Sequence, residues 1–241
     1  MTAVFEVFEY KYDVVEIVAQ QNYSQENFFA ETHEVITDFN KSDRVLKKLE
    51  ENLGKQGISQ LMMVYFSERK DLERLILSAV WHSIKHPKKN ILQDFGNEDI
   101  LEISKICRSV SRERHRMLAF VRFELLQDEV YFAKIEPDFN VLPLIRKHFK
   151  ERYADQKWMI FDLKRHYGIF YDLKEVHFFT PDSSQLQNFR NSEQFHHEEE
   201  KKYQKLWQRY FVKTGIPERK NMKLHIQWVP KRYWKYLTEK F

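Results

Sequence analysis

The chain has 241 residues, 42% hydrophobic and 15% aromatic, which is enough for one large folded domain or two small ones. This aromatic content excludes a disordered chain. No run of about eighteen apolar residues occurs, which excludes a membrane-spanning helix. The single cysteine, Cys107, excludes an intrachain disulfide and a cysteine-based metal centre. The N-terminal residues lack the basic start of a secretory signal, so we expect a cytoplasmic protein.

The formal net charge of +4 is unevenly distributed. Residues 105–122 hold six basic residues against one acidic residue, and residues 213–240 hold eight against two. Two basic segments on an otherwise acidic chain indicate a surface that faces a polyanion, provided that the segments meet in space. The alternative is that these residues only cover solvated faces of helices.

Helical periodicity dominates the first half of the chain. An apolar stripe over residues 4–12 predicts a helix that lacks an N-cap, because Met1 already lies inside the pattern. A short β-rich run follows at residues 14–19. Further helices are predicted over residues 41–52, which ends near Gly54, over 58–66, and over 71–86, which Pro87 ends. Asn97 is the predicted N-cap of a helix that runs to about Arg116.

The second half mixes strands and helices. Alternating residues predict a β-hairpin from strands 119–126 and 130–136, with further strands over 158–163 and 169–180. We expect Asp138 or Asn140 to cap a helix that begins near Pro143. A polar loop is predicted over 181–192, an extended tail over 222–228, and a short last helix opened by Pro230. A helix over 193–214 is predicted to turn four apolar residues inward, namely Tyr203, Leu206, Tyr210 and Phe211.

These elements predict an α+β fold, a single domain over residues 1–241, with a mainly antiparallel sheet flanked by helices. The familiar catalytic signatures are absent, including glycine-rich phosphate loops and the zinc-protease motif. His82 and His86 have a spacing that can bind metal, but the pattern supplies no nearby carboxylate. We therefore predict no metal and no cofactor.

Several carboxylates lie near basic residues in the middle of the chain. Converging carboxylates beside an arginine can perform acid–base chemistry or hold Mg²⁺. The candidate catalytic residues are Glu113, His115, Glu136, Asp138 and Asp162. The alternative is that the carboxylates are helix caps and ion-pair partners of Arg116, Arg122 and Arg152.

The C-terminal tail interleaves lysines and arginines with tryptophans and tyrosines. Basic groups follow phosphates and aromatic faces stack on unpaired bases, which is the chemistry of single-strand binding. The alternative is that Trp228 and Trp234 anchor the tail on the core. The candidate nucleic-acid-binding residues are Arg116, Arg122, Arg152, Arg165, Arg219, Asn221, Arg232 and Trp234.

Three sequence blocks resemble a bacterial family described as probable DNA-metabolism proteins, a domain of unknown function. They are E-x-H-R-M-x-x-F-V-R-F at 113–123, I-E-P-D-x-N-V-L-P-L-I at 135–145, and P-x-R-Y-W at 230–234. The resemblance covers most of the chain from about residue 100 and assigns no catalytic residue. Members of the family tend to be encoded beside a radical-SAM protein assigned to DNA modification or repair, which implies a related role here. In other bacteria the same domain is joined to a uracil-DNA-glycosylase-like domain.

Similar members begin with a strand before the first helix, whereas Met1 here stands within that helix. We therefore expect that the chain starts late, truncated within its first helix, and that one edge of the sheet lacks a strand.

The leading hypothesis is an accessory protein of DNA repair or modification that binds DNA, single-stranded or damaged, and acts with a radical-SAM partner. One alternative is an enzyme that acts on DNA or nucleotides through a carboxylate and arginine cleft. Another is a protein-interaction module without nucleic-acid contact. The leading hypothesis predicts that the two basic segments converge on the same side of the sheet.

Overall fold

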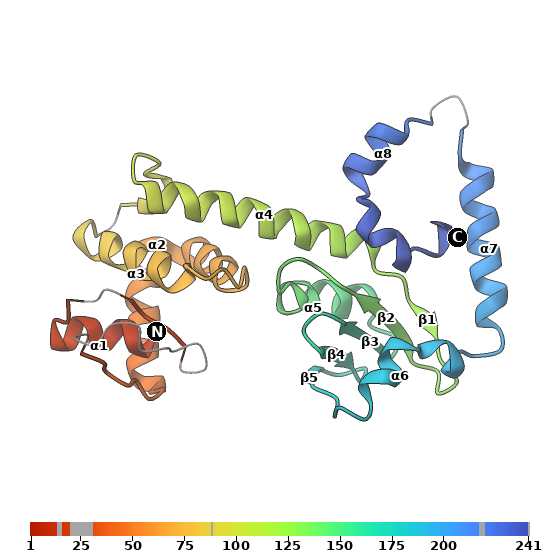
Figure 1. The fold of residues 1–241 in the computed structure, drawn as a ribbon, viewed down its shortest axis with the longest axis horizontal. Coiled ribbons are helices and arrows are strands. Elements are labelled where there is room, and N and C mark those ends of the chain that lie inside the picture. Colours follow the sequence, from red (N-terminus) through yellow and green to blue (C-terminus); the bar gives the residue numbers. More distant parts are fainter. Residues whose placement is uncertain (14–15, 20–30, 88, 217–219, 241) are drawn as a thin grey trace. The chain divides into compact units, whose positions relative to one another are not determined.

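The computed structural model describes residues 1–13, 16–19, 31–87, 89–216 and 220–240. It has the predicted α+β fold, with a mainly antiparallel sheet flanked by helices (Figure 1). Backbone contacts group the chain into two compact units, residues 1–111 and residues 112–241. The single domain over residues 1–241 stays a prediction. Within the described ranges, no helix combines the length and apolar character needed to cross a membrane.

The N-terminal unit is built from helices in the part that the structure describes. Its elements are α1 (Thr2–Tyr10), α2 (Phe39–Tyr65), α3 (Leu72–Lys85), the short 3-10 helix η2 (Ile91–Gln93) and the first part of α4 (Glu98–Phe120). Asp38 caps α2 and Asn97 caps α4, as each side chain accepts hydrogen bonds from backbone N–H groups of the first turn. Met1 occupies the N-cap position of α1 and provides no side-chain cap. The apolar faces of these helices form the core of the unit.

Helix α2 contains both of the helices predicted over 41–52 and 58–66. Its chain bends at Gly54, whose φ of 68° and ψ of 176° are not helical. This backbone conformation is almost restricted to glycine, because a Cβ atom would strain it. The β-rich run predicted at 14–19 lies partly outside the described residues, and residues 16–19 form no strand.

The sheet belongs to the C-terminal unit. Its strands are β1 (Glu124–Leu125), β2 (Tyr131–Ile135), β3 (Trp158–Asp162), β4 (Tyr167–Tyr171) and β5 (Val176–Phe179), in that spatial order. Only β2 and β3 pair in parallel, because helix α5 (Leu142–Arg152) crosses between them. The predicted hairpin of β1 and β2 is confirmed. Its turn contains no glycine, and Glu129 adopts the required left-handed conformation, with a φ of 61°.

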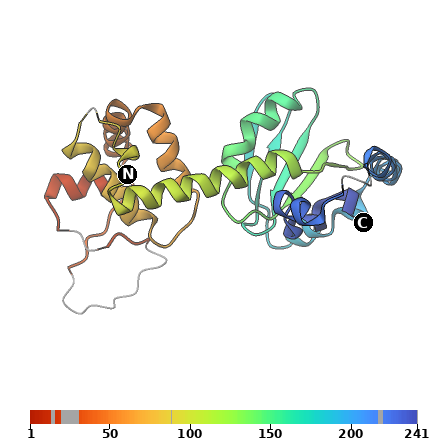
Figure 2. The same ribbon diagram turned by 90° about the horizontal axis from the view of Figure 1, so that it is seen from above.

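Helices cover both faces of the sheet in the C-terminal unit (Figures 1 and 2). On one face, Trp158 contacts Phe149 of α5 with ring centroids 6.0 Å apart. On the other, Phe161 stacks on Phe189 of α6 (Leu186–Arg190) at 4.6 Å. Gly168 makes room for this packing, because a Cβ atom there would lie 2.5 Å from the Phe179 ring.

Four element predictions are wrong. Helix α4 continues to Phe120, so the strand predicted over 119–126 shrinks to two residues. Val141, without a side-chain cap, stands at the start of α5, because Asp138 and Asn140 bond elsewhere. The loop predicted over 181–192 contains α6. The tail predicted as extended forms helix α8 (Met222–Trp228).

The C-terminal segment is helical over most of its described length. After the 3-10 helix η3 (Ser192–Phe195) come α7 (Glu200–Thr214), α8, and the 3-10 helices η5 (Lys231–Tyr236) and η6 (Thr238–Lys240). Asn221 caps α8, because its side chain accepts from the backbone N–H of Leu224 at 3.0 Å. Pro230 immediately precedes η5, so the short last helix is confirmed.

Candidate nucleic-acid interface

Glu113 lies at the centre of a hydrogen-bond network in the C-terminal unit. Its side chain is only 1% exposed, although it is a charged residue near the end of α4. One carboxylate oxygen accepts from the backbone N–H of Asp138 at 2.9 Å and from the Tyr233 hydroxyl at 2.6 Å. The other accepts from the guanidinium of Arg232 at 2.9 Å. Glu113 therefore joins α4, the corner after β2 and η5.

The groups around Glu113 hold fixed protonation states. Burial, reinforced by the hydrogen bond to Glu113, raises the pKa of Tyr233, so its hydroxyl remains a donor. Arg232 also pairs with the carboxylate of Asp138. Burial opposes its charge, but the Tyr233 hydrogen bond and the charge of Glu113 raise the pKa of Arg232. Arg116 lies farther away, at 3.6 Å from Glu113.

Asp162 and Arg165 form a second buried pair, at the turn between β3 and β4. Asp162 is completely buried and accepts from the backbone N–H groups of Lys164 and Arg165, and from the Arg165 guanidinium at 2.8 Å. Burial raises the pKa of the Asp162 carboxyl. The guanidinium also donates to the carbonyls of Pro137 and Asp138. The pair therefore holds the turn against the corner after β2.

Two further carboxylates hold the C-terminal segment in place. Glu136 accepts from Tyr236 at 2.7 Å and from Lys235, and the Lys235 hydrogen bond lowers the pKa of Glu136. Glu239 accepts from Arg122 at 2.7 Å and from the Trp207 indole N–H at 2.9 Å. Burial opposes its charge, but these two bonds lower the pKa of Glu239.

These contacts bring parts of the two basic segments together, as predicted. Glu113 and Arg122 belong to the first segment, and their partners Arg232 and Glu239 belong to the second. Most of the arginines chosen for phosphate contact are nevertheless paired with carboxylates. Among the described residues, these carboxylates form ion pairs with arginines and lysines, as the alternative to a catalytic role predicts.

The other predicted site residues do not join the network. His115 and Arg152 are exposed, with Arg152 beside the Tyr153 ring. Asn221 is a helix cap. Trp234 is half-buried and donates to the carbonyl of Val229 at 3.0 Å, a contact within the tail itself. Arg219 lies outside the described residues.

Helix α7 turns its apolar stripe outward, so the prediction that Tyr203, Leu206, Tyr210 and Phe211 face inward is wrong. Tyr210 is 59% exposed and Tyr203 is 49% exposed. The face toward the unit is mainly polar, although Phe211 borders it, with its ring centroid 5.2 Å from Lys240 of η6. Glu200 accepts from the backbone N–H of Leu125, and Gln208 donates to the carbonyl of Thr238. Figures 1 and 2 show α7 at the margin of the C-terminal unit.

The same helix is uniformly basic. No aspartate or glutamate occurs between Glu200 and Glu218, while α7 carries five cations: Lys201, Lys202, Lys205, Arg209 and Lys213. Of these five cations, only Lys202 lies within ion-pair distance of a described carboxylate, that of Glu199 at 3.6 Å. This acid-free stretch is the signal that identifies the exposed helix in the sequence, and periodicity alone missed it.

A family model described as a domain of unknown function, DUF4130, matches residues 70–239. The chain belongs to the DUF4130 family. No curated protein and no solved structure matches the chain. The DUF4130 match includes the Glu113 network and all of α7.

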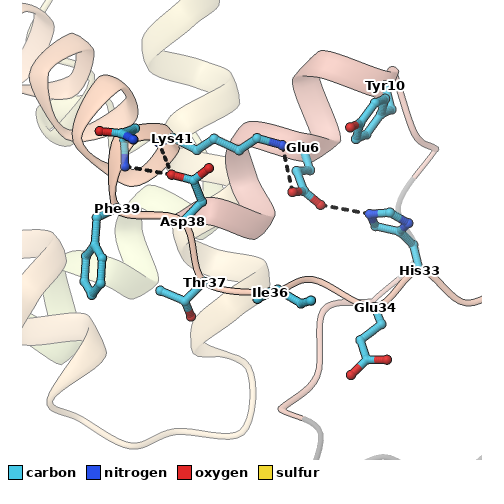
Figure 3. Close-up of a pocket in the computed structure, with 10 residues that line it drawn as sticks. Glu6, Tyr10, His33, Glu34, Ile36, Thr37, Asp38, Phe39 and Lys41 are labelled. Atoms are coloured by element: carbon cyan, nitrogen blue, oxygen red, sulfur yellow. Dashed lines mark hydrogen bonds and ion pairs between the residues drawn. The ribbon is translucent and has the colours of Figure 1, made fainter.

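One surface depression lies outside the DUF4130 match, in the N-terminal unit. It has a volume of about 580 Å³ and is lined by residues of α1, of segment 33–38 and of the start of α2 (Figure 3). Within it, Glu6 accepts from Lys41 at 2.9 Å and from His33 at 2.8 Å. Glu6 is therefore paired within the depression by Lys41 and His33.

The pair His82 and His86 and the thiol of Cys107 also lie inside the DUF4130 match, and both make contacts within the protein. His82 is hydrogen-bonded to Asp94 at 3.1 Å and contacts the His86 ring. In the parts of the chain with described coordinates, no three His, Cys, Asp or Glu side chains are placed to hold a metal. Cys107 is buried and donates to the carbonyl of Gln60, and burial raises the pKa of its thiol to about 11. Such a thiol is a poor nucleophile.

Proposed function

We propose that this protein binds nucleic acid as an accessory component of DNA repair or modification and acts with a radical-SAM partner. The observation that carries the proposal is the exposed, acid-free face of α7, where five cations alternate with four aromatic residues over residues 201–213. Cations that lack carboxylate partners are available for phosphates, and binding to phosphates releases counterions.

The biological setting rests on the sequence blocks at 113–123, 135–145 and 230–234. These blocks resemble DNA-metabolism proteins that tend to be encoded beside radical-SAM proteins. The DUF4130 match includes the same blocks and α7, so the basic helix belongs to the family's domain.

The contacts of the carboxylates favour this binding role over the alternative of an enzyme cleft. Glu113, Glu136 and Asp162 each accept from cations and hydroxyl or backbone N–H donors of their own unit. A general base needs an accessible proton acceptor near its substrate. Carboxylates saturated by internal donors instead stabilise the fold.

Salt-dependent binding to a fluorescein-labelled single-stranded oligonucleotide tests the proposal. Between about 50 and 200 mM salt, we expect log K to fall linearly with log salt, by about 0.7 for each phosphate neutralised. Changing Lys205, Arg209 and Lys213 to Gln should reduce this slope by about 2. A control variant with Lys147, Lys157 and Lys174 changed to Gln alters exposed lysines away from α7 and should keep the slope.

Absence of binding at low salt, or binding that does not decline with salt, would contradict the proposal. The role of the partner is tested with the purified radical-SAM protein. Each protein alone and the mixture are assayed for DNA binding and for product formation, and an accessory role predicts that the mixture exceeds either protein alone. Equal activity with and without this chain would contradict the accessory role.

A further inference from the structure

We infer that the outward stripe of α7, formed by Tyr203, Trp207 and Tyr210, is a stacking platform for the unpaired bases of a single strand. The inference rests on the proposed function and specifies the class of nucleic acid. Side chains three or four residues apart on a helix are neighbours, about 5–6 Å apart. Trp207 and Tyr210 form a stacked pair, and Tyr203 lies one turn earlier on the same side of α7, where its hydroxyl donates to Glu199 at 3.2 Å.

Contacts within the C-terminal unit position two rings of the platform, Trp207 and Tyr210. The Trp207 indole N–H donates to Glu239 at 2.9 Å, and the guanidinium of Arg122 lies 5.7 Å from the Trp207 ring centroid. Trp207 in turn stacks on Tyr210, with ring centroids 5.7 Å apart and an angle of 27° between the planes. The aromatic pair is thus ordered in advance, which reduces the entropy lost on binding.

Open faces and nearby cations complete the platform. Tyr210 is 59% exposed, so the stacked pair leaves an aromatic face for a base. Helical spacing puts Lys202, Arg209 and Lys213 side by side, next to the stripe. Aromatic rings bordered by cations are the arrangement that binds bases and phosphates of a single strand together.

Two other occupants fit the surface less well. Protein interfaces are depleted in lysine, and four of the five cations of α7 are lysines. A second copy of this chain would bring these like charges together. Duplex DNA stacks its bases on one another, so it presents their edges instead of free aromatic faces. A single strand uses both the rings and the cations.

The experiment compares two double variants of the full chain. Tyr203→Leu with Tyr210→Leu keeps apolar volume but removes both aromatic faces, whereas Tyr203→Phe with Tyr210→Phe keeps them. For a labelled oligo(dT), we expect the Leu variant to bind at least about tenfold more weakly, because each stacked base is worth about tenfold or more. The Phe variant should remain within about threefold of the unmodified chain. The salt slope should be unchanged in both, because the cations remain.

Folding and the fluorescence of the unmodified chain provide separate checks. Both tyrosines are exposed and leucine favours helices, so the circular dichroism spectrum should be retained. Oligo(dT) should quench the tryptophan fluorescence of the unmodified chain, and the quenching should be reduced in a Trp207→Phe variant. Unchanged quenching in that variant would place the bases elsewhere and overturn the inference.

Other outcomes also decide the matter. Equal oligo(dT) affinity of the Leu variant and the unmodified chain overturns the inference while the salt-dependent binding of the proposed function stands. An equal loss of oligo(dT) affinity in the Phe and Leu variants would show that the aromatic faces do not stack on bases, and would overturn the inference. Self-association in sedimentation that the Leu variant abolishes, with DNA affinity intact, assigns the stripe to a protein interface and overturns the inference. If the unmodified chain binds no DNA, the proposed function fails as well.

Discussion

At the scale of single residues, the site is a set of charges that neutralise one another across long sequence separations. Glu113 and Arg232 are 119 residues apart in the sequence and 2.9 Å apart in space. The sequence analysis chose Glu113 as a carboxylate near basic residues and Arg232 as a cation of the aromatic C-terminal tail. The roles predicted for them were catalysis and phosphate binding, since no sequence pattern indicates which distant charge neutralises which.

Replacing Glu113 tests this structural role. Glu113→Ala leaves the Tyr233 hydroxyl and the Asp138 N–H without an acceptor and Arg232 with one partner fewer. Breaking a buried pair costs about 3–5 kcal/mol, and Arg232 is 41% exposed, so we expect a loss of about 3 kcal/mol in the free energy of unfolding. Urea unfolding monitored by tryptophan fluorescence measures it.

A matched control is Glu151→Ala, which removes an exposed carboxylate 3.8 Å from Lys147. Exposed pairs contribute about 0–1 kcal/mol, so this variant should unfold almost like the unmodified chain. Equal stability of the Glu113→Ala and Glu151→Ala variants would show that Glu113 does not hold the unit together.

At the scale of elements, the sequence located helices better than it oriented them. Helices α1, α3 and the bulk of α4 occur where periodicity predicts them. Helix α7 also forms, but its apolar stripe faces solvent, because Glu200 and Gln208 hold the opposite face to the unit. Periodicity measures how residues are distributed around a helix and contains no information on what packs against each side.

The bend in α2 provides a test at this scale. Gly54→Ala has open space around the new Cβ atom, so any loss of stability comes from the backbone, whose φ is 68°. We expect a loss of about 1–3 kcal/mol in the free energy of unfolding, measured by circular dichroism in urea. Gly96→Ala is the control, because Gly96 has no positive φ and only ordinary contact with Asp94. Similar stabilities of the two variants would exclude backbone strain at Gly54.

At the scale of the whole molecule, stability should depend on paired carboxylates and therefore on pH. Glu136 and Glu239 both have a pKa below the ordinary value of 4.5. Their contribution to stability is present above pH 4.5 and is lost as the pH falls through the lowered pKa. Asp162 has the opposite effect on stability. Burial raises its pKa, so its contribution to the free energy of unfolding increases as the pH falls.

We expect the free energy of unfolding, measured by urea titration at pH 7, 5, 4 and 3, to fall most steeply below pH 4.5. Glu239→Gln removes one of the titrating groups and should flatten the curve. A free energy of unfolding that stays constant or rises between pH 5 and pH 3 would contradict this account.

The sequence by itself determined the fold class, most helices, the hairpin and the inert character of Cys107, because these depend on local periodicity and composition. Tertiary structure decided the pairing of the charges and the direction in which α7 faces. It also decided that Asn221 caps a helix, where alternation had predicted an extended tail. These features depend on contacts between residues far apart in the chain, and such contacts form only when the elements pack.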